Sequence, residues 1–382
     1  MSAAHRPKEW VRRALVCGAL LAAAALGIPG QAYAAPADPP PDNQTLVVLL
    51  EQLQDLYQKA EQATETYVQA KVDLEENQSK AERLDRQLAE ERTALSDARS
   101  LAGQLAREQY KSGGVSPYLS LLLSRDPQDA FTQGHVLDRA AGSQADLVAQ
   151  LENGEKRIAA LNRAQQHALD GSAQLEEKQR EAKEDIERQL ADVERILAGL
   201  TGSQIEDLQE LEQQGIDRAQ AAFLRSGRLG SSALAPSLAG NRALSFAYAQ
   251  LGKPYVWGAE GPKAYDCSGL TSRAWEHAGT TIPRTSQEQW KQLPRVPLDQ
   301  LRPGDLVVYF PGATHVAMYI GNGMVIQAPR PGAVVKISPI ASNPVLGAVR
   351  PDSGAPSMTH YVSPPVPRSA TDPTPLGTAP RP

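Results

Sequence analysis

The sequence has very little cysteine: its 382 residues include only Cys17 and Cys267. Cys17 lies in an N-terminal stretch that we expect to be removed, so the mature chain keeps one cysteine and cannot form an intramolecular disulfide. This excludes a disulfide-stabilised scaffold. A lone cysteine is more often a small buried hydrophobic residue than a nucleophile, so its neighbours must decide the role of Cys267.

The chain also lacks an excess of positive charge and has few aromatic residues. The net charge of -5 leaves no basic surface of the kind that binds nucleic acid, so we expect no nucleic-acid partner. Aromatic residues make up 5% of the chain, and three of the four tryptophans lie between residues 240 and 350, which predicts an aromatic core there. We see no cluster at metal-ligand spacing and no phosphate-binding glycine loop, so we expect no metal and no cofactor.

Only one apolar run is long enough to discuss as a membrane segment. Residues 14–28 follow a basic stretch and precede the small-residue motif Ala32-Tyr33-Ala34. About 15 apolar residues are too few to span a bilayer, so residues 1–34 are predicted to be a secretory signal peptide. The mature protein would be secreted, either extracellular or associated with the cell wall. A retained anchor and a lipid-modified Cys17 are the alternatives.

A heptad pattern occupies the next part of the chain and predicts a coiled coil over residues 43–225. Breaks at Gly113-Gly114 and Ser116-Pro117 separate two long series, so the simplest arrangement is an antiparallel helical hairpin. A further helix from Ser203 to about Leu224 is expected to fold back on the pair. The first series places these residues at the seam: Leu46, Leu49, Leu53, Leu56, Ala60, Ala63, Tyr67, Ala70, Leu74, Asn77, and on to Leu105.

Composition sets the remaining boundaries. Residues 226–239 are rich in Gly, Ser and Ala and are predicted to be a flexible linker, whereas residues 353–382 are rich in Pro, Ser and Thr and are predicted to be a disordered tail. Residues 240–352 then form a separate domain, which contains Cys267. Leu119 and the leucines at 121–123 lie at the expected hairpin tip, where they either contact a partner or cap the hairpin's own core.

Cys267 lies where an irregular segment changes to a helical pattern. Leu270, Ala274 and Ala278 recur at helical spacing and Gly279 ends the pattern, so Asp266 is predicted to be the helix N-cap. A thiol in the first helical turn lies near unpaired N-H groups and the positive end of the macrodipole, which favours the thiolate. This position suits a nucleophile.

A cysteine nucleophile requires a base, and residues 240–350 contain only His277 and His315. His277 lies ten residues further along the same helix, about 15 Å away, so it cannot reach the sulfur. His315 is therefore the candidate base. It opens the second of three predicted strands, which cover residues 306–310, 316–320 and 324–328, with a Gly321-Asn322-Gly323 hairpin turn between the last two.

The base needs a third polar group to orient its other ring nitrogen. Gln327 is the only polar side chain of the last strand before Arg330. A strict two-residue turn would place Arg330 opposite His315, so the choice of Gln327 requires a bulge or a looser turn.

Four blocks over about 110 residues give this region a clear resemblance to the NlpC/P60 family of bacterial cell-wall cysteine peptidases. The blocks are Pro254-Tyr255-Val256-Trp257-Gly258 with Asp266-Cys267-Ser268-Gly269-Leu270, then Pro283-Arg284-Thr285-Ser286, then Pro303-Gly304-Asp305-Leu306-Val307, then residues 315–323 with Gln327-Ala328-Pro329. The resemblance implies an α+β, papain-like domain in which Cys267 is the nucleophile, His315 the base and Gln327 the third residue. It places Tyr255 beside the oxyanion.

Several further residues take their roles from the same resemblance, which implies that Ser268 and Ser286 contribute to oxyanion or substrate binding, with Asp266 first of all a cap. For Arg284 two roles stay open: holding a substrate carboxylate or bonding to loop carbonyls. Two positions depart from the family pattern, namely Ala259, where a second glycine is frequent, and Gln327, where histidine is common. A neutral amide fixes the imidazole tautomer but does not stabilise imidazolium by charge, so we expect activity with a shifted pH profile.

The resemblance implies a secreted peptidoglycan endopeptidase that cuts the stem-peptide bond between D-glutamate and a diamino acid. The coiled coil would restrain or target the enzyme, through a membrane or division-complex protein, during wall remodelling or cell separation. One alternative is a non-catalytic scaffold or activator of another wall hydrolase, which unreactive Cys267 would indicate. Another is acyl transfer to an amine, which the product masses would reveal.

Overall fold

The computed structural model describes residues 43–111, 127–230, 234–373 and 376–377. The predicted signal peptide and the predicted hairpin tip, including Leu119 and residues 121–123, lie outside the described residues.

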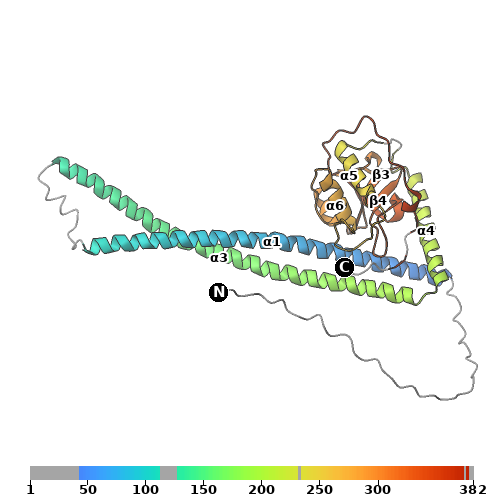
Figure 1. The fold of residues 1–382 in the computed structure, drawn as a ribbon, viewed down its shortest axis with the longest axis horizontal. Coiled ribbons are helices and arrows are strands. Elements are labelled where there is room, and N and C mark those ends of the chain that lie inside the picture. Colours follow the sequence, from blue (N-terminus) through green and yellow to red (C-terminus); the bar gives the residue numbers. More distant parts are fainter. Residues whose placement is uncertain (1–42, 112–126, 231–233, 374–375, 378–382) are drawn as a thin grey trace, which may run out of the picture. The chain divides into compact units, whose positions relative to one another are not determined.

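Two long helices run antiparallel to each other. α1 spans Asn43–Lys111 and α3 spans Pro127–Ala198, and Figure 1 shows them side by side. Contacts between them join early residues of one helix to late residues of the other: Leu53 packs with Val193, and Arg99 pairs with Glu155. Asn77 lies at the seam, as the heptad pattern predicts, and donates to the Ala168 carbonyl at 2.7 Å.

α4, Gly202–Arg225, connects these helices to the C-terminal domain. It begins with a capping box in which the Thr201 hydroxyl and the Gln204 side chain bond reciprocally to the backbone. Leu208 packs into the hairpin's core, which confirms that this helix folds back on the pair. At the other end, Phe223 packs into the sheet of the C-terminal domain, and Gln220 bonds to the Gly323 carbonyl at 2.9 Å.

The C-terminal domain contains a six-stranded antiparallel sheet in the order β1-β6-β2-β3-β4-β5. The three strands expected from sequence are present with bounds shifted by a residue, and β1, β5 and β6 add to them. Their bounds are β1 Arg295–Val296, β2 Leu306–Tyr309, β3 His315–Gly321, β4 Met324–Gln327, β5 Lys336–Pro339 and β6 Val345–Val349. Short 3-10 helices cover Leu298–Gln300, Ile340–Ser342 and Arg368–Ala370.

Helices cover one face of this sheet. α5, Leu238–Tyr248, and α6, Cys267–His277, share a core with inward residues of β2, β3 and β4, while α7, Ser286–Gln292, follows a cap at Thr285. Trp275 is fully buried here and donates to the Gly304 carbonyl, so it is a core residue. The opposite face has a second core, to which α4 contributes Phe223. The domain is thus α+β, as predicted.

The described part of the C-terminal tail contains no helix or strand beyond the short 3-10 turn. Arg302 and Asp352 form a buried ion pair at 2.6 Å where the tail leaves the domain. Further on, Leu376 packs against the hairpin's core, and the Tyr57 hydroxyl donates to the Gly377 carbonyl at 3.0 Å.

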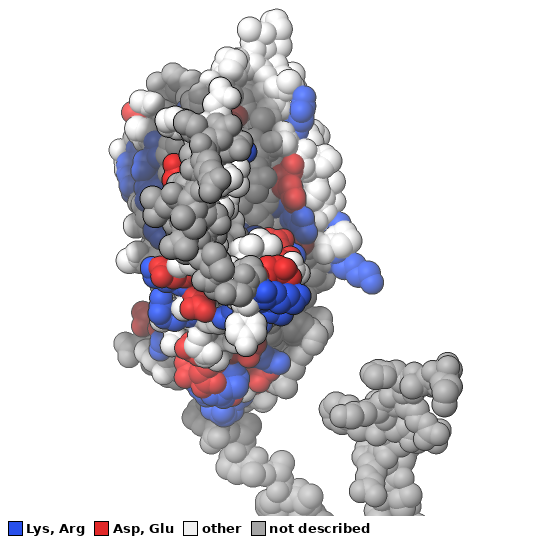
Figure 2. Space-filling model, turned by 90° about the vertical axis from the view of Figure 1, so that its left-hand side faces the viewer, with Lys and Arg blue, Asp and Glu red and all other residues white. Residues whose placement is uncertain are grey.

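Charged side chains of both signs are intermixed on the face drawn in Figure 2, as the small net charge suggests. Within the described part of the chain, no helix combines the length and the apolar character needed to cross a membrane.

Candidate active site

Cys267 is the first residue of α6. Asp266 adopts extended backbone before it and accepts from the Gly269 N-H at 2.6 Å, so it is the N-cap that the sequence predicts. Gly269 is required here because a Cβ would lie 2.3 Å from the Ala259 carbonyl oxygen. The thiol is buried at the helix N-terminus, where unpaired N-H groups gather.

His315 begins β3 and is completely buried. Its Nε2 lies 2.7 Å from Gln327 Oε1, which is hydrogen-bonding distance for one tautomer. A bulge between Tyr319 and Gly321 shifts the pairing of β3 with β4 by one residue. Continuing the shifted register places Gln327 diagonally across from His315, within reach of a long side chain.

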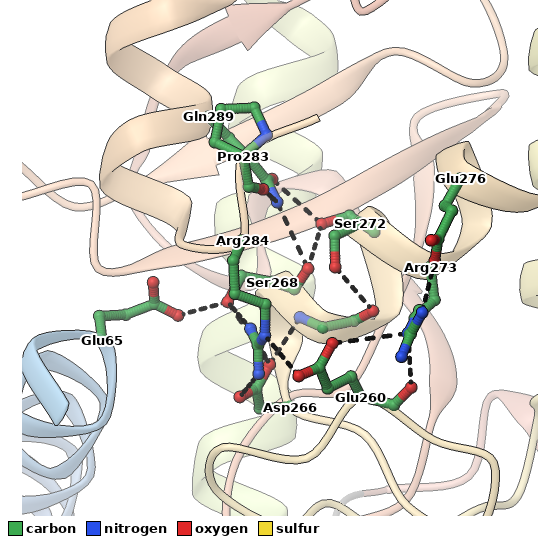
Figure 3. A network of polar contacts seen from close by, with 12 residues as sticks. Glu65, Glu260, Asp266, Ser268, Ser272, Arg273, Glu276, Pro283, Arg284 and Gln289 are labelled. Carbon is green, nitrogen blue, oxygen red and sulfur yellow. Dashed lines mark hydrogen bonds and ion pairs between the residues drawn. The ribbon is translucent and has the colours of Figure 1, made fainter. Parts of the chain in front are cut away.

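Arg284 lies in a polar network with Asp266, Ser268 and Glu65 (Figure 3). Its guanidinium bonds to both carboxylate oxygens of Asp266, at 3.1 and 2.7 Å, and to the Ser268 hydroxyl at 2.9 Å. These contacts are made with side chains and not with loop carbonyls, whereas the role of Arg284 as a substrate clamp stays a prediction. In this arrangement Arg284 holds the capping carboxylate and Ser268 in place beside Cys267.

Two glutamates of α1 enter this site, one helical turn apart. Glu65 is buried; it accepts from the Ser268 hydroxyl at 2.7 Å and from the Ser286 N-H at 2.6 Å, and Cys267 Sγ lies 3.5 Å from it. Glu61 Oε1 lies 3.2 Å from His315 Nδ1, close enough for an ion pair, although Nδ1 lacks hydrogen-bond geometry. Because residues at i and i+4 share a helix face, the thiol and the imidazole lie under one short stretch of α1.

These contacts alter the protonation of the site. Burial raises the pKa of the Cys267 thiol well above its usual value, and Glu65 and Asp266 add to the effect. Burial alone would lower the pKa of His315, but Glu61 and Gln327 raise it. Burial, together with the nearby Asp266 carboxylate, raises the pKa of Glu65 to about 7. The site as arranged therefore favours a neutral thiol.

The remaining predicted residues surround this centre. Tyr255 is buried, and its hydroxyl has no hydrogen-bond partner among the described residues. The Cys267 charge is among the causes that raise the pKa of Tyr255, after burial itself, so the two side chains are near each other. Ser286 directs its hydroxyl to the Ala313 carbonyl at 2.7 Å, so only its backbone N-H faces Glu65. Both Tyr255 and this N-H can donate to a bound group.

Sequence reasoning missed the α1 residues, because charged side chains outside a heptad seam are ordinarily solvent-exposed. Glu61, Thr64, Glu65 and Val68 all lie off the seam and are all buried. Tyr67 also packs edge-on against Trp257, with ring centroids 5.1 Å apart. The available signal was a set of apolar residues outside the seam, which includes Tyr57, Val68 and Val72.

Within the described residues, no group of three or more His, Cys, Asp or Glu side chains is placed to hold a metal ion. The arrangement can perform nucleophilic chemistry, since it brings together a thiol, an imidazole with an orienting amide, and an unpaired hydroxyl donor.

Comparison with known proteins agrees with this geometry. Residues 252–348 match the family model described as NlpC/P60 family. A probable endopeptidase of Corynebacterium glutamicum is 42% identical over 118 residues, which are 31% of this chain and 56% of that protein. The chain thus spans about half the length of that relative. A probable endopeptidase of Mycobacterium tuberculosis is 29% identical over 350 residues, covering 79% of this chain and 89% of that protein.

Among solved structures, RipD of Mycobacterium tuberculosis is described as a non-catalytic NlpC/p60 domain protein adapted to peptidoglycan binding. It is 30% identical, with a TM-score of 0.28, and the match covers 29% of this chain and 96% of that chain. Residues 252–348 thus form a domain of the NlpC/P60 family.

Proposed function

We propose that this protein is an exported peptidoglycan hydrolase, a cysteine endopeptidase that cuts a stem peptide between D-glutamate and a diamino acid. The observation that carries the proposal is the joint contact of Glu61 and Glu65 with His315 and Cys267, because it places nucleophile and base under one surface. The printed names of the curated relatives, probable endopeptidases, support the reaction class.

The chemistry follows from the site. Cys267 attacks the amide carbonyl as a thiolate, and the Tyr255 hydroxyl and the Cys267 N-H donate to the oxyanion. His315 takes the thiol proton and returns it to the leaving amine, which breaks the C-N bond and leaves a thioester. Water then attacks the thioester with His315 as base, releasing the acid and the thiol. Gln327 orients the imidazole through the 2.7 Å contact without adding charge.

The same contacts support a latent state. Glu65 occupies the donors beside Cys267 that an acyl group would need, and Cys267 is 1% exposed. Hydrolysis therefore requires α1 to move away. The signal-like residues 1–34 support export, and a membrane or division-complex protein that binds the hairpin would supply the displacement.

The experiment compares four full-length proteins on purified peptidoglycan: wild type, Cys267→Ala, Glu65→Lys, and the double variant Glu65→Lys/Cys267→Ala. A lysine beside Arg284 disfavours the closed arrangement, so Glu65→Lys should release fragments ending in D-glutamate faster than wild type. The double variant Glu65→Lys/Cys267→Ala should release none. Fragments are identified by mass, and continued cleavage by the double variant would refute the assignment of Cys267.

A non-catalytic binder is the second candidate, because Glu61 engages the base and the neutral thiol is the favoured form in this arrangement. If Glu65→Lys binds peptidoglycan but cuts nothing, while its Cys267 also resists alkylation, the binder is the better account.

A further inference from the structure

A cavity of about 810 Å³ lies at the junction of α1, α4 and the ends of β4 and β5. Glu61 and Gln327 both line it, so it opens directly beside the group that orients His315. The reaction proposed above does not use this space.

The wall formed by the C-terminal domain is cationic. Lys336 pairs directly across from Gln327 in the sheet, which places the two side chains next to each other on one face. Arg330 follows β4 by three residues, and both cationic side chains line the cavity. Lys336 is buried and donates to the Asp372 carbonyl. Arg330 Nε is buried without a hydrogen-bond partner among the described residues.

The opposite wall is acidic. Glu51, Asp55 and Glu61 of α1 line the cavity, and Glu212 of α4 forms a two-pronged pair with Arg330 at 2.5 and 2.9 Å. Arg330 also lies over the Tyr57 ring, 4.7 Å from its centroid. Glu212 of α4 is thus the direct partner of Arg330, and Glu51, Asp55 and Glu61 of the hairpin add further negative charge to the cavity wall.

Displacing α1 changes this balance. Glu51, Asp55 and Glu61 would leave with α1, whereas α4 is tied to the domain by Phe223 and by Gln220, which bonds to the Gly323 carbonyl and the Ala341 N-H. Arg330 and Lys336 would then face the open cleft with Glu212 as the remaining carboxylate of the three-residue group. Two cations and one anion match a ligand that carries two carboxylates or a carboxylate and an ammonium group.

The position of the cavity decides which part of a substrate it meets. His315 returns its proton to the leaving amine, so the leaving residue must lie on the His315 and Gln327 side of Cys267. The acyl part lies on the other side, by the donors that now bind Glu65. The cavity is on the leaving side, since Gln327 is part of its wall.

We propose that Arg330 and Lys336 form a subsite that binds the distal carboxylate of the leaving diamino acid, and that Glu212 of α4 receives its distal ammonium group. This inference rests on the hydrolase function proposed above. It assigns a helix outside the matched family segment to substrate selection, because α4 precedes residue 252.

The test uses full-length Glu65→Lys and wild-type protein with three tripeptides, L-alanyl-γ-D-glutamyl-X. X is diaminopimelate, its distal carboxamide, or lysine. Charge-assisted contacts predict that the tripeptide with a distal carboxylate is preferred over the tripeptide with the distal carboxamide by roughly tenfold or more in kcat/KM, mainly through KM. Lys336→Gln should reduce this preference to about twofold, while Lys291→Gln, an exposed lysine on α7, should leave it intact.

Arg330→Gln alone strands the Glu212 carboxylate in a buried place, so it is paired with Glu212→Gln to keep the fold. The double variant should lose the preference for the free distal carboxylate. It should also lose the preference for a free distal amine, measured with a fourth tripeptide whose diaminopimelate is acetylated at that amine. An equal rate for acid and amide in the parent protein, or an unchanged preference in Lys336→Gln, overturns the subsite while leaving the hydrolase function standing.

If no tripeptide is cut, the hydrolase function fails and binding still decides the subsite. Calorimetry of diaminopimelyl-D-alanine with Glu65→Lys should give a dissociation constant that weakens roughly tenfold in Lys336→Gln. Equal affinities, or no binding to the parent protein, would overturn it.

Discussion

Replacing Glu65 by glutamine should make the closed arrangement of α1 over the active site less sensitive to pH. The amide has nearly the same shape, and it can accept from the Ser286 N-H while donating to the Ser268 hydroxyl, so both present contacts have a counterpart. What it loses is the ability to ionise. The substitution therefore isolates the cost of burying a carboxylate from the value of its hydrogen bonds.

The size of the effect follows from the pKa of Glu65, which burial raises from 4.5 to about 7. Such a shift in pKa changes the free energy of closing α1 over the site by about 3 kcal/mol between pH 4.5 and 7. Because the pKa is raised in the closed state, the contribution of Glu65 to closure is full below pH 4.5 and is lost as pH rises through about 7. The raised pKa values of His315 and Cys267 act in the same direction, so closing takes up protons and alkaline pH favours opening.

The assay is the rate of Cys267 alkylation in full-length protein from pH 5 to 8.5, read by peptide mass. At pH 8 the Glu65→Gln protein should be alkylated up to roughly 100-fold more slowly than wild type, whereas the two should converge near pH 5. Glu76→Gln, an exposed position on the same helix, should follow wild type throughout. A ratio of wild type to Glu65→Gln that does not change with pH would show that burial of this carboxylate does not control closure.

Three further changes test other parts of the site. In the Glu65→Lys background, Tyr255→Phe should lower kcat by about 100-fold with little change in KM, because the Tyr255 hydroxyl donates only to the oxyanion. An equal loss of kcat in the control Tyr265→Phe would point to a general disruption of the domain. Asp266→Ala should lower the free energy of unfolding in urea by about 3–5 kcal/mol, because it leaves the nearly buried Arg284 without its carboxylate partner. The control Glu276→Ala removes only an exposed ion pair with Arg273 and should lower that free energy by less than about 1 kcal/mol. Gln327→Glu should raise the pKa of His315 further, observed in selectively labelled histidine spectra, because a carboxylate stabilises imidazolium; no change would mean that the 2.7 Å contact does not couple the two groups.

Much of the C-terminal domain could be predicted from local chemistry. Asp266 before a helical pattern predicts a cap, and hydrophobic runs around Gly321-Asn322-Gly323 predict a hairpin, so the thiol and the imidazole could each be placed on an element. The bulge required for Gln327 was inferred from residue counting, and it lies between Tyr319 and Gly321. β1 and β6 escaped prediction because their pairing joins residues about 50 apart, and no turn signal links them.

The contact of α1 with the catalytic domain could not be predicted, because a heptad repeat specifies only one face of a helix. The seam residues Leu53 and Ala60 pack within the hairpin, and the same helix turns Glu61 and Glu65 toward His315 and Cys267. Nothing local distinguishes these glutamates from solvated ones such as Glu76, since their burial depends on a surface more than 200 residues away. The carboxylates stay buried because Ser268, Ser286 and His315 offer donors or positive charge. Burial raises the pKa of Glu65, and Glu61 helps to raise the pKa of His315. Under the proposed function, the residues that carry out the reaction and the residues that restrain it therefore lie in different parts of the chain and come together only in the folded protein.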